Sequence, residues 1–132
     1  MKLYLASFLE PHNFGPGRVI SIANGDKPDH IECDQVFPWL VPSIETTKQY
    51  RDESLNNPKV AGKNFVDRFT SELDAFMDEL TETCKKDGVT PQDILPFEDG
   101  DTLASWERAD FTNYRRLVAP YLEKLGYEVV NN

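Results

Sequence analysis

The sequence predicts an α/β fold in which helices pack on a small mixed sheet of about four strands, as a single layered domain over residues 1–132. Short β-branched or apolar segments lie near both ends of the chain, and one long segment between them carries apolar residues at helical spacing. Clusters of glycine, proline and asparagine separate these segments. With 132 residues, the chain is long enough to bury one core.

The first third of the chain predicts two strands joined by turns. Residues 2–8 alternate in polarity and read as a strand, and residues 18–23 are β-branched and read as a second one. Residues 10–17, rich in glycine and proline, form the loop between them. A later stretch, residues 36–42, is unusually apolar for a connection, and we expect it to pack on the core.

The middle of the chain predicts helices. Ser43 can cap a short helix that runs to about Glu53, and residues 58–86 form the strongest helical pattern. In that longer segment nine apolar residues share one face: Ala61, Phe65, Val66, Phe69, Leu73, Phe76, Met77, Leu80 and Cys84. Gly88 ends the helix.

The last part of the chain predicts a strand, a helix and a short final strand. Residues 90–95 form a turn or short helix, residues 102–106 a strand, and residues 112–125 a helix that Pro120 should kink. Gly126 stops this helix, and residues 127–130 can add the last strand.

The charge balance excludes some partners and leaves others open. The net charge is −9, so the surface as a whole is a poor match for long nucleic acid, although a local basic pocket can hold a small anion. The acidic surface can also engage a basic protein partner or serve only for solubility. No apolar run is long enough for a membrane span, and the first residues do not resemble a signal peptide, so we expect a cytoplasmic protein without a membrane partner.

Cysteines and histidines give little sign of a metal or of a cross-link. Cys33 and Cys84 are far apart and suit two free thiols in a reducing compartment. Together with His12 and His30 they do not reach the ligand spacing of a zinc site. We therefore expect no metal site and no cofactor.

The end of the third predicted strand and the start of the last predicted helix carry the candidate site. Trp106 and Glu107 end the strand, and Arg115 and Arg116 stand in the first turn of the helix. Positive charge there opposes the helix dipole, so the arginines make sense if an anion sits over the exposed backbone N–H groups. The alternative is a salt bridge from an arginine to the acidic turn at residues 98–101.

Glu107 admits three roles. Beside the indole of Trp106 and away from water its pKa would rise, which suits a general acid or base. Near an arginine it would stay ionised and act as a clamp, and on the surface it would pair with Arg108.

Other strand ends supply the remaining walls of the expected pocket, because the ends of neighbouring strands converge on one side of a sheet. We expect Ser7 from the first strand and Ser21 and Asn24 from the second. Arg18 follows a glycine-rich loop whose backbone could approach a ligand.

Several segments resemble the YeaO-like family, family 488 of the domains of unknown function. The resemblance is carried by residues 1–8, 19–23 and 40–42 and by the region from residue 102 to the end. Ser105-Trp106-Glu107 matches a Cys-Tyr-Glu strand end of the family, and Asn113-Tyr114-Arg115 falls where Cys-His-Arg is usual.

Departures from the family pattern bear on the chemistry. The usual cysteine and histidine are replaced by Asn113 and Tyr114, and an arginine usual after the second strand is replaced by Asn24, whereas Glu107 and Arg115 are kept. The resemblance implies a pocket kept for binding with its chemistry altered or absent. Such divergent stand-alone versions are similar to small bacteriophage proteins.

Three functions follow as hypotheses. The first is binding of an anionic, nucleotide-like small molecule, with Arg115 and Arg116 on the anion, Trp106 and Tyr114 stacked on a planar group, and Asn113 nearby. The second is an enzyme that uses Glu107 as base or nucleophile on a phosphorylated nucleoside. The third is an acidic interaction protein, for example a viral inhibitor.

Overall fold

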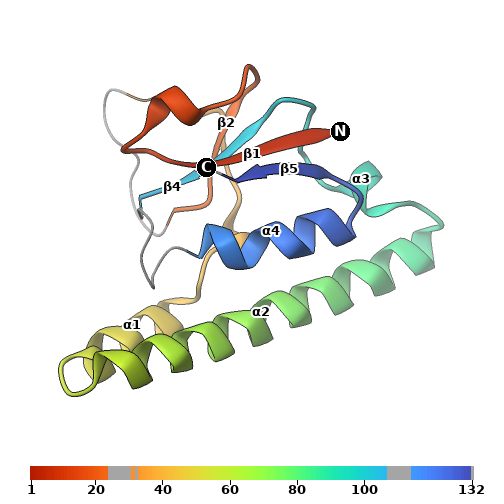
Figure 1. The fold of residues 1–132 in the computed structure, drawn as a ribbon. Coiled ribbons are helices and arrows are strands. Elements are labelled where there is room, and N and C mark those ends of the chain that lie inside the picture. Colours follow the sequence, from red (N-terminus) through yellow and green to blue (C-terminus); the bar gives the residue numbers. More distant parts are fainter. Residues whose placement is uncertain (24–30, 32, 107–113, 132) are drawn as a thin grey trace.

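The computed structural model describes residues 1–23, 31, 33–106 and 114–131, and its strands form one parallel sheet (Figure 1). The strands lie in the order β3-β2-β4-β1-β5. Their bounds are Lys2–Ser7 for β1, Val19–Ser21 for β2, Gln35–Val36 for β3, Thr102–Ser105 for β4 and Glu128–Asn131 for β5. The predicted α/β class is confirmed, with five strands instead of about four and with every described pairing parallel instead of mixed.

The helices follow the predicted order. Their bounds are Ile44–Ser54 for α1, Pro58–Asp87 for α2, Pro91–Ile94 for α3 and Arg115–Lys124 for α4. Ser43 caps α1 by accepting from the backbone N–H of Thr46 at 3.1 Å, and Gly88 ends α2 in the left-handed region. The sequence predicts both helix ends. Backbone N–H groups at the start of a helix need acceptors such as the Ser43 hydroxyl, and a left-handed glycine such as Gly88 commonly ends a helix.

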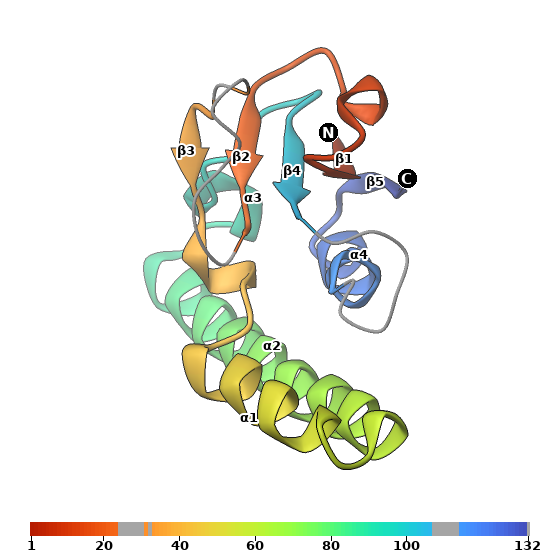
Figure 2. The ribbon, with the colours of Figure 1, turned by 90° about the vertical axis from the view of Figure 1, so that its left-hand side faces the viewer.

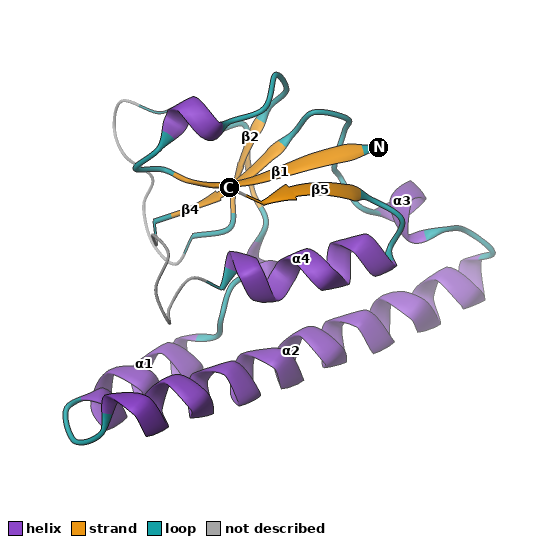
Figure 3. Cartoon of the chain, in the orientation of Figure 1, coloured by secondary structure: helices purple, strands orange, loops and turns teal. Residues whose placement is uncertain are grey.

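All the long helices lie on one side of the sheet (Figure 3). Leu3, Leu5, Ile20 and Leu103 form the sheet side of a buried cluster that also includes residues of α2 and α4, among them Phe69. Figure 1 shows α4 between β5 and α2, so the helices are themselves layered beneath the sheet. We call this side of the sheet the helix face.

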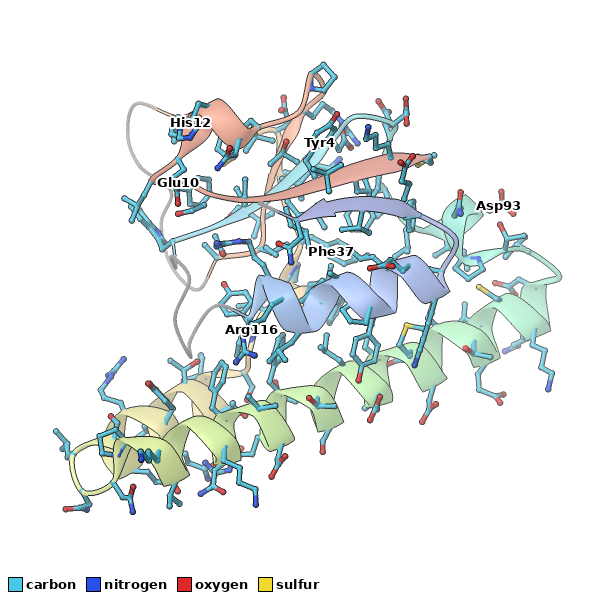
Figure 4. The ribbon with its side chains drawn as sticks, in the orientation of Figure 1. Tyr4, Glu10, His12, Phe37, Asp93 and Arg116 are labelled. Carbon is cyan, nitrogen blue, oxygen red and sulfur yellow. The ribbon has the colours of Figure 1, made fainter. Side chains whose placement is uncertain are left out.

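The opposite side of the sheet, the loop face, is covered by the connection from β1 to β2. This connection contains the short 3₁₀ helix η1, Pro11–Asn13, which lies above the sheet in Figure 4, where Glu10 and His12 are labelled. The backbone N–H of Gly15 donates to the hydroxyl of Thr102 at 2.7 Å, and a Cβ on Gly15 would lie 2.3 Å from the ring of Tyr4. The backbone of the glycine-rich loop therefore lies close against β1 and β4, and a residue with a Cβ at position 15 would clash with Tyr4.

The apolar stretch at residues 36–42 packs on the core only in part. Phe37 and Leu40 are buried as expected, whereas Val36 and Trp39 are exposed. The two-residue edge strand β3 and the 3₁₀ helix η2, Pro38–Leu40, turn Phe37 and Leu40 toward the core and leave the side chains between them at the surface. A strand of two residues is too short to leave a periodic pattern in the sequence.

Side-chain hydrogen bonds hold α1 against α2. The carboxylate of Glu72 accepts from the backbone N–H and the hydroxyl of Ser43, each at 2.8 Å, and from the hydroxyl of Thr46. Near the other end of α1, Glu53 pairs with Arg68. Within the described residues, no helix is long and apolar enough to cross a membrane.

Candidate functional site

Two neighbouring strands of the sheet are followed, among the described residues, by elements that pack on opposite faces. The strands are β1 and β4, which pair in parallel with Ser7 beside Ser105. After β1 the chain passes over the loop face, and the helix that follows β4 in the chain, α4, packs on the helix face. Ligands of open parallel sheets bind in the crevice that such a divergence leaves at the carboxyl ends of the strands.

Arg115, the first residue of α4, lies at this end of the sheet. Its side chain is buried, with 1% of its surface exposed, and its Nη1 donates to the Oγ of Ser105 at 2.6 Å. Burying a guanidinium costs free energy, and its charge at a helix N-terminus opposes the dipole, so helix stability alone does not explain it. Arg116, the next residue, is exposed (Figure 4).

Ser7 and Trp106 complete the described part of this end. The hydroxyl of Ser7 is buried, donates to the carbonyl of Trp106 at 3.3 Å and accepts from the backbone N–H of Leu9 at 3.1 Å. The indole of Trp106 is 36% exposed and meets the ring of Phe8 edge-on, with centroids 5.6 Å apart. The structure therefore brings the predicted site residues Ser7 and Arg115 to the same end of the sheet. The indole of Trp106 lies at this end too, but with Phe8 on the loop face, away from the helix face on which Arg115 packs.

Ser105 was not among the predicted site residues, yet it is the hydroxyl that holds Arg115. It is fully buried and faces the helices, two positions beyond Leu103. The available signal was its position in the predicted strand at residues 102–106, directly before the candidate residue Trp106.

Ser21 lies on the other face of the sheet, which corrects its predicted place in the pocket wall. It stands beside Ala104 in the register, whereas Ser7 and Ser105 are one step further along their strands. Successive residues of a strand point to opposite faces, so that single step separates Ser21 from Arg115. The hydroxyl of Ser21 accepts from the backbone N–H of Ala23 at 3.2 Å.

Tyr114 is a core residue, which corrects its predicted stacking role. Its ring is 2% exposed and meets Phe69 edge-on, and its hydroxyl donates to the carbonyl of Ile22 at 2.5 Å. The ring is engaged in the core against Phe69, and its hydroxyl ties the start of α4 to the residue after β2.

Arg18 lies at the opposite, amino-terminal end of the sheet, which corrects its predicted ligand role. Its Nη2 is 2.7 Å from the Oδ2 of Asp101 and donates to the carbonyl of Pro96 at the same distance. An ion pair with the acidic turn had been considered for Arg115 or Arg116, and the structure shows that Arg18 makes it.

Asp101 is the buried partner of this pair, with 1% of its surface exposed. Burial acts to raise the pKa of its carboxyl, but hydrogen bonds from the Arg18 side chain and from the backbone N–H groups of Glu98 and Arg18 outweigh burial and lower the pKa below its ordinary value. The same hydrogen bond to Asp101 raises the pKa of Arg18, so both groups stay charged.

Three predicted site residues, Asn24, Glu107 and Asn113, lie outside the described residues. The roles considered for Glu107 therefore stay predictions. Among the described residues no three His, Cys, Asp or Glu side chains come together as a metal site, and neither Cys33 nor Cys84 forms a disulfide there.

Comparison of the chain with models of protein families, with curated proteins and with solved structures finds no match. The likeness to the YeaO-like family stays a prediction from the sequence. The site is therefore argued from its own geometry.

Proposed function

We propose that this chain is a small cytoplasmic protein that binds an anionic, nucleotide-like molecule in the crevice between the carboxyl ends of β1 and β4. The observation that carries the proposal is the buried Arg115 at the divergence point of a parallel sheet. A crevice at this position, a helix N-terminus and a guanidinium each favour negative charge, and here they coincide.

Fewer residues are proposed to bind the ligand than the sequence alone predicts. Arg115 would contact phosphate or carboxylate through its planar fork, with Ser105 holding the guanidinium in place. Trp106 keeps about a third of its surface exposed on the loop side of the same strand end, where it would cover a planar group that extends past the strand ends from Arg115. Arg116 would add long-range attraction from the surface without a fixed contact.

Differential thermal stability with a ligand panel tests the proposal. The panel contains nucleoside mono- and diphosphates, cyclic dinucleotides, dicarboxylates and inorganic phosphate. A ligand that binds only the folded state raises its stability by mass action, so at least one organic anion should raise the melting temperature. Calorimetric titration then gives the dissociation constant.

Arg115→Lys and Arg116→Ala form the matched pair for this test. Lysine keeps the charge but loses the fork, so Arg115→Lys should weaken binding about tenfold or more, since a charged hydrogen bond contributes about 1.5 to 3 kcal/mol. Arg116→Ala should change the dissociation constant by less than about threefold, as expected of an exposed charge.

Two results would contradict the proposal. One is a wild-type protein that no anion in the panel stabilises. The other is equal weakening by both variants, which would indicate attraction by the surface and not a site built on Arg115. Circular dichroism of both variants separates loss of binding from loss of folding.

A further inference from the structure

A second, separate feature of the molecule is an open pocket beside β3. It has a volume of about 180 Å³ and lies between η2, α2 and α3. Its walls are Trp39 from η2, Phe76, Glu79, Leu80 and Thr83 from α2, and Ile94 from α3. Figure 2 shows α3 behind β2 and β3, and α2 below the sheet, with the chain after β3 leading down toward α2.

Apolar side chains of this pocket are exposed to water. Trp39 is 62% exposed and Ile94 is 42% exposed, while Leu80 is buried. Single exposed apolar residues are common, but here an indole and an isoleucine converge on one hollow. Tryptophan is among the residues that contribute most to protein interfaces when they sit in such hollows.

Trp39 is held in this exposed position by its neighbours in the chain. Phe37 and Leu40 on either side of it are buried in the core, and Pro38 fixes the backbone between them. The indole is therefore presented by a constrained turn, so little conformational entropy is lost when a partner covers it.

The surroundings of the pocket are acidic. Residues 70–83 of α2 contain five acids and no base: Glu72, Asp74, Asp78, Glu79 and Glu82. Glu72 is engaged with α1 and Asp74 accepts from the hydroxyl of Tyr121, whereas Asp78, Glu79 and Glu82 are exposed and form no ion pair with any described residue. The lysines at positions 85 and 86 follow one turn later.

We propose that this pocket docks a segment of a partner protein in which an apolar side chain is flanked by lysines or arginines. The apolar side chain would lie between Trp39 and Ile94, and the basic residues would meet the acids of α2 around Glu79. A second copy of this chain fits less well, because it carries a net charge of −9 and would bring like charge to an acidic rim. This inference does not rest on the proposed anion site.

Synthetic helical peptides test the proposal. One series has a central leucine or tryptophan with lysines on the flanking turns, and a matched series has glutamates in place of the lysines. Calorimetric titration at low and at physiological salt should show binding of the lysine series, weaker at the higher salt because exposed charges are screened. The glutamate series should not bind.

Trp39→Ala and Leu55→Ala are the matched variants. Both replace an exposed apolar residue: Leu55 is 83% exposed at the turn before α2, whereas the α2 residues of the pocket lie toward the other end of that helix. Trp39→Ala should weaken binding of the lysine peptides at least about tenfold, and Leu55→Ala should leave it unchanged. Glu79→Gln should give a smaller loss that disappears at high salt.

Four outcomes would overturn the proposal. The first is that every lysine peptide has a dissociation constant above about 1 mM, and the second is that the glutamate series binds equally well. The third is equal binding of the lysine peptides to wild type and to Trp39→Ala. The fourth is a wild-type dimer, detected by light scattering, that Trp39→Ala dissociates. The last result would assign the pocket to a second copy.

Discussion

Each end of the parallel sheet carries an arginine, and the two arginines have different surroundings. At the amino-terminal end Arg18 keeps about a quarter of its side chain exposed and pairs with the carboxylate of Asp101. At the carboxyl end Arg115 is almost fully buried and donates to the neutral hydroxyl of Ser105. The two arginines therefore differ in burial: Arg18 reaches solvent at one end of the sheet, whereas Arg115 is enclosed at the other end.

Two buried tyrosines, one at each end of the sheet, differ in the hydrogen bonding of their hydroxyl groups. Tyr114, at the carboxyl end, is buried and its hydroxyl donates to the carbonyl of Ile22. Tyr127, which precedes β5 at the amino-terminal end, is also buried, but its hydroxyl has no hydrogen-bond partner among the described residues, and burial raises its pKa to about 12. We therefore expect the hydroxyls of Tyr114 and Tyr127 to contribute differently to the free energy of unfolding, which replacement of each tyrosine by phenylalanine can measure.

The largest expected effect is in the core beneath the carboxyl end. Phe69 is fully buried and meets Tyr114, so Phe69→Ala should lower the free energy of unfolding by about 3 to 5 kcal/mol, as measured by denaturant titration. Phe76 is only partly buried, and Phe76→Ala should cost less. Losses below about 1 kcal/mol at both positions would contradict the packing of α2 beneath the sheet.

The next effect concerns the charge pair at the amino-terminal end. Asp101→Asn should lower the free energy of unfolding at pH 7 by about 1 to 3 kcal/mol, because donors directed at the carboxylate lose their charged acceptor. This range is below that of a fully buried ion pair, since Arg18 reaches solvent.

The pH dependence of the same variant has a defined sign. The pKa of Asp101 is lower in the folded protein than its ordinary value of 3.8, so its contribution is fully present above about pH 4 and is lost as the pH falls through the folded pKa. Wild type and Asp101→Asn should therefore converge in stability under acid conditions. A difference that stays constant down to pH 2 would indicate that packing, and not ionisation, distinguishes them.

The smallest effects compare the two tyrosine hydroxyls. Tyr114→Phe should cost about 1 to 2 kcal/mol, because the carbonyl of Ile22 loses a buried donor. Tyr127→Phe removes a hydroxyl without a described partner and should be neutral or slightly stabilising. Parallel denaturant titrations provide the comparison, and equal losses at both positions would mean that the two ends do not differ in this way.

Local patterns in the sequence were sufficient for most of the elements. The spacing of Phe65, Phe69 and Leu73 placed α2, and Ser43 and Gly88 marked helix ends, because these signals depend on residues a few positions apart. The edge strand β3 was missed, since it exists only through its pairing with β2.

The candidate site was predicted less completely because its residues meet through the register of the sheet. Ser7 and Arg115 were identified and do come to one end of the sheet, but Ser105 was missed and Ser21 was placed on the wrong face. A single step along a strand reverses the direction of a side chain, and no local pattern in β2 indicates which partner stands beside it.

Sequence patterns alone predicted the α/β class, the long amphipathic helix and the concentration of polar residues at strand ends, because these follow from short-range periodicity and from the chemistry of turns. Packing in three dimensions was needed to show that Arg18 pairs with Asp101 across 83 positions, that Tyr114 is core and that Trp39 is exposed beside an acidic helix. These outcomes depend on which surfaces meet when the sheet and helices pack together, and that information is spread over residues far apart in the chain.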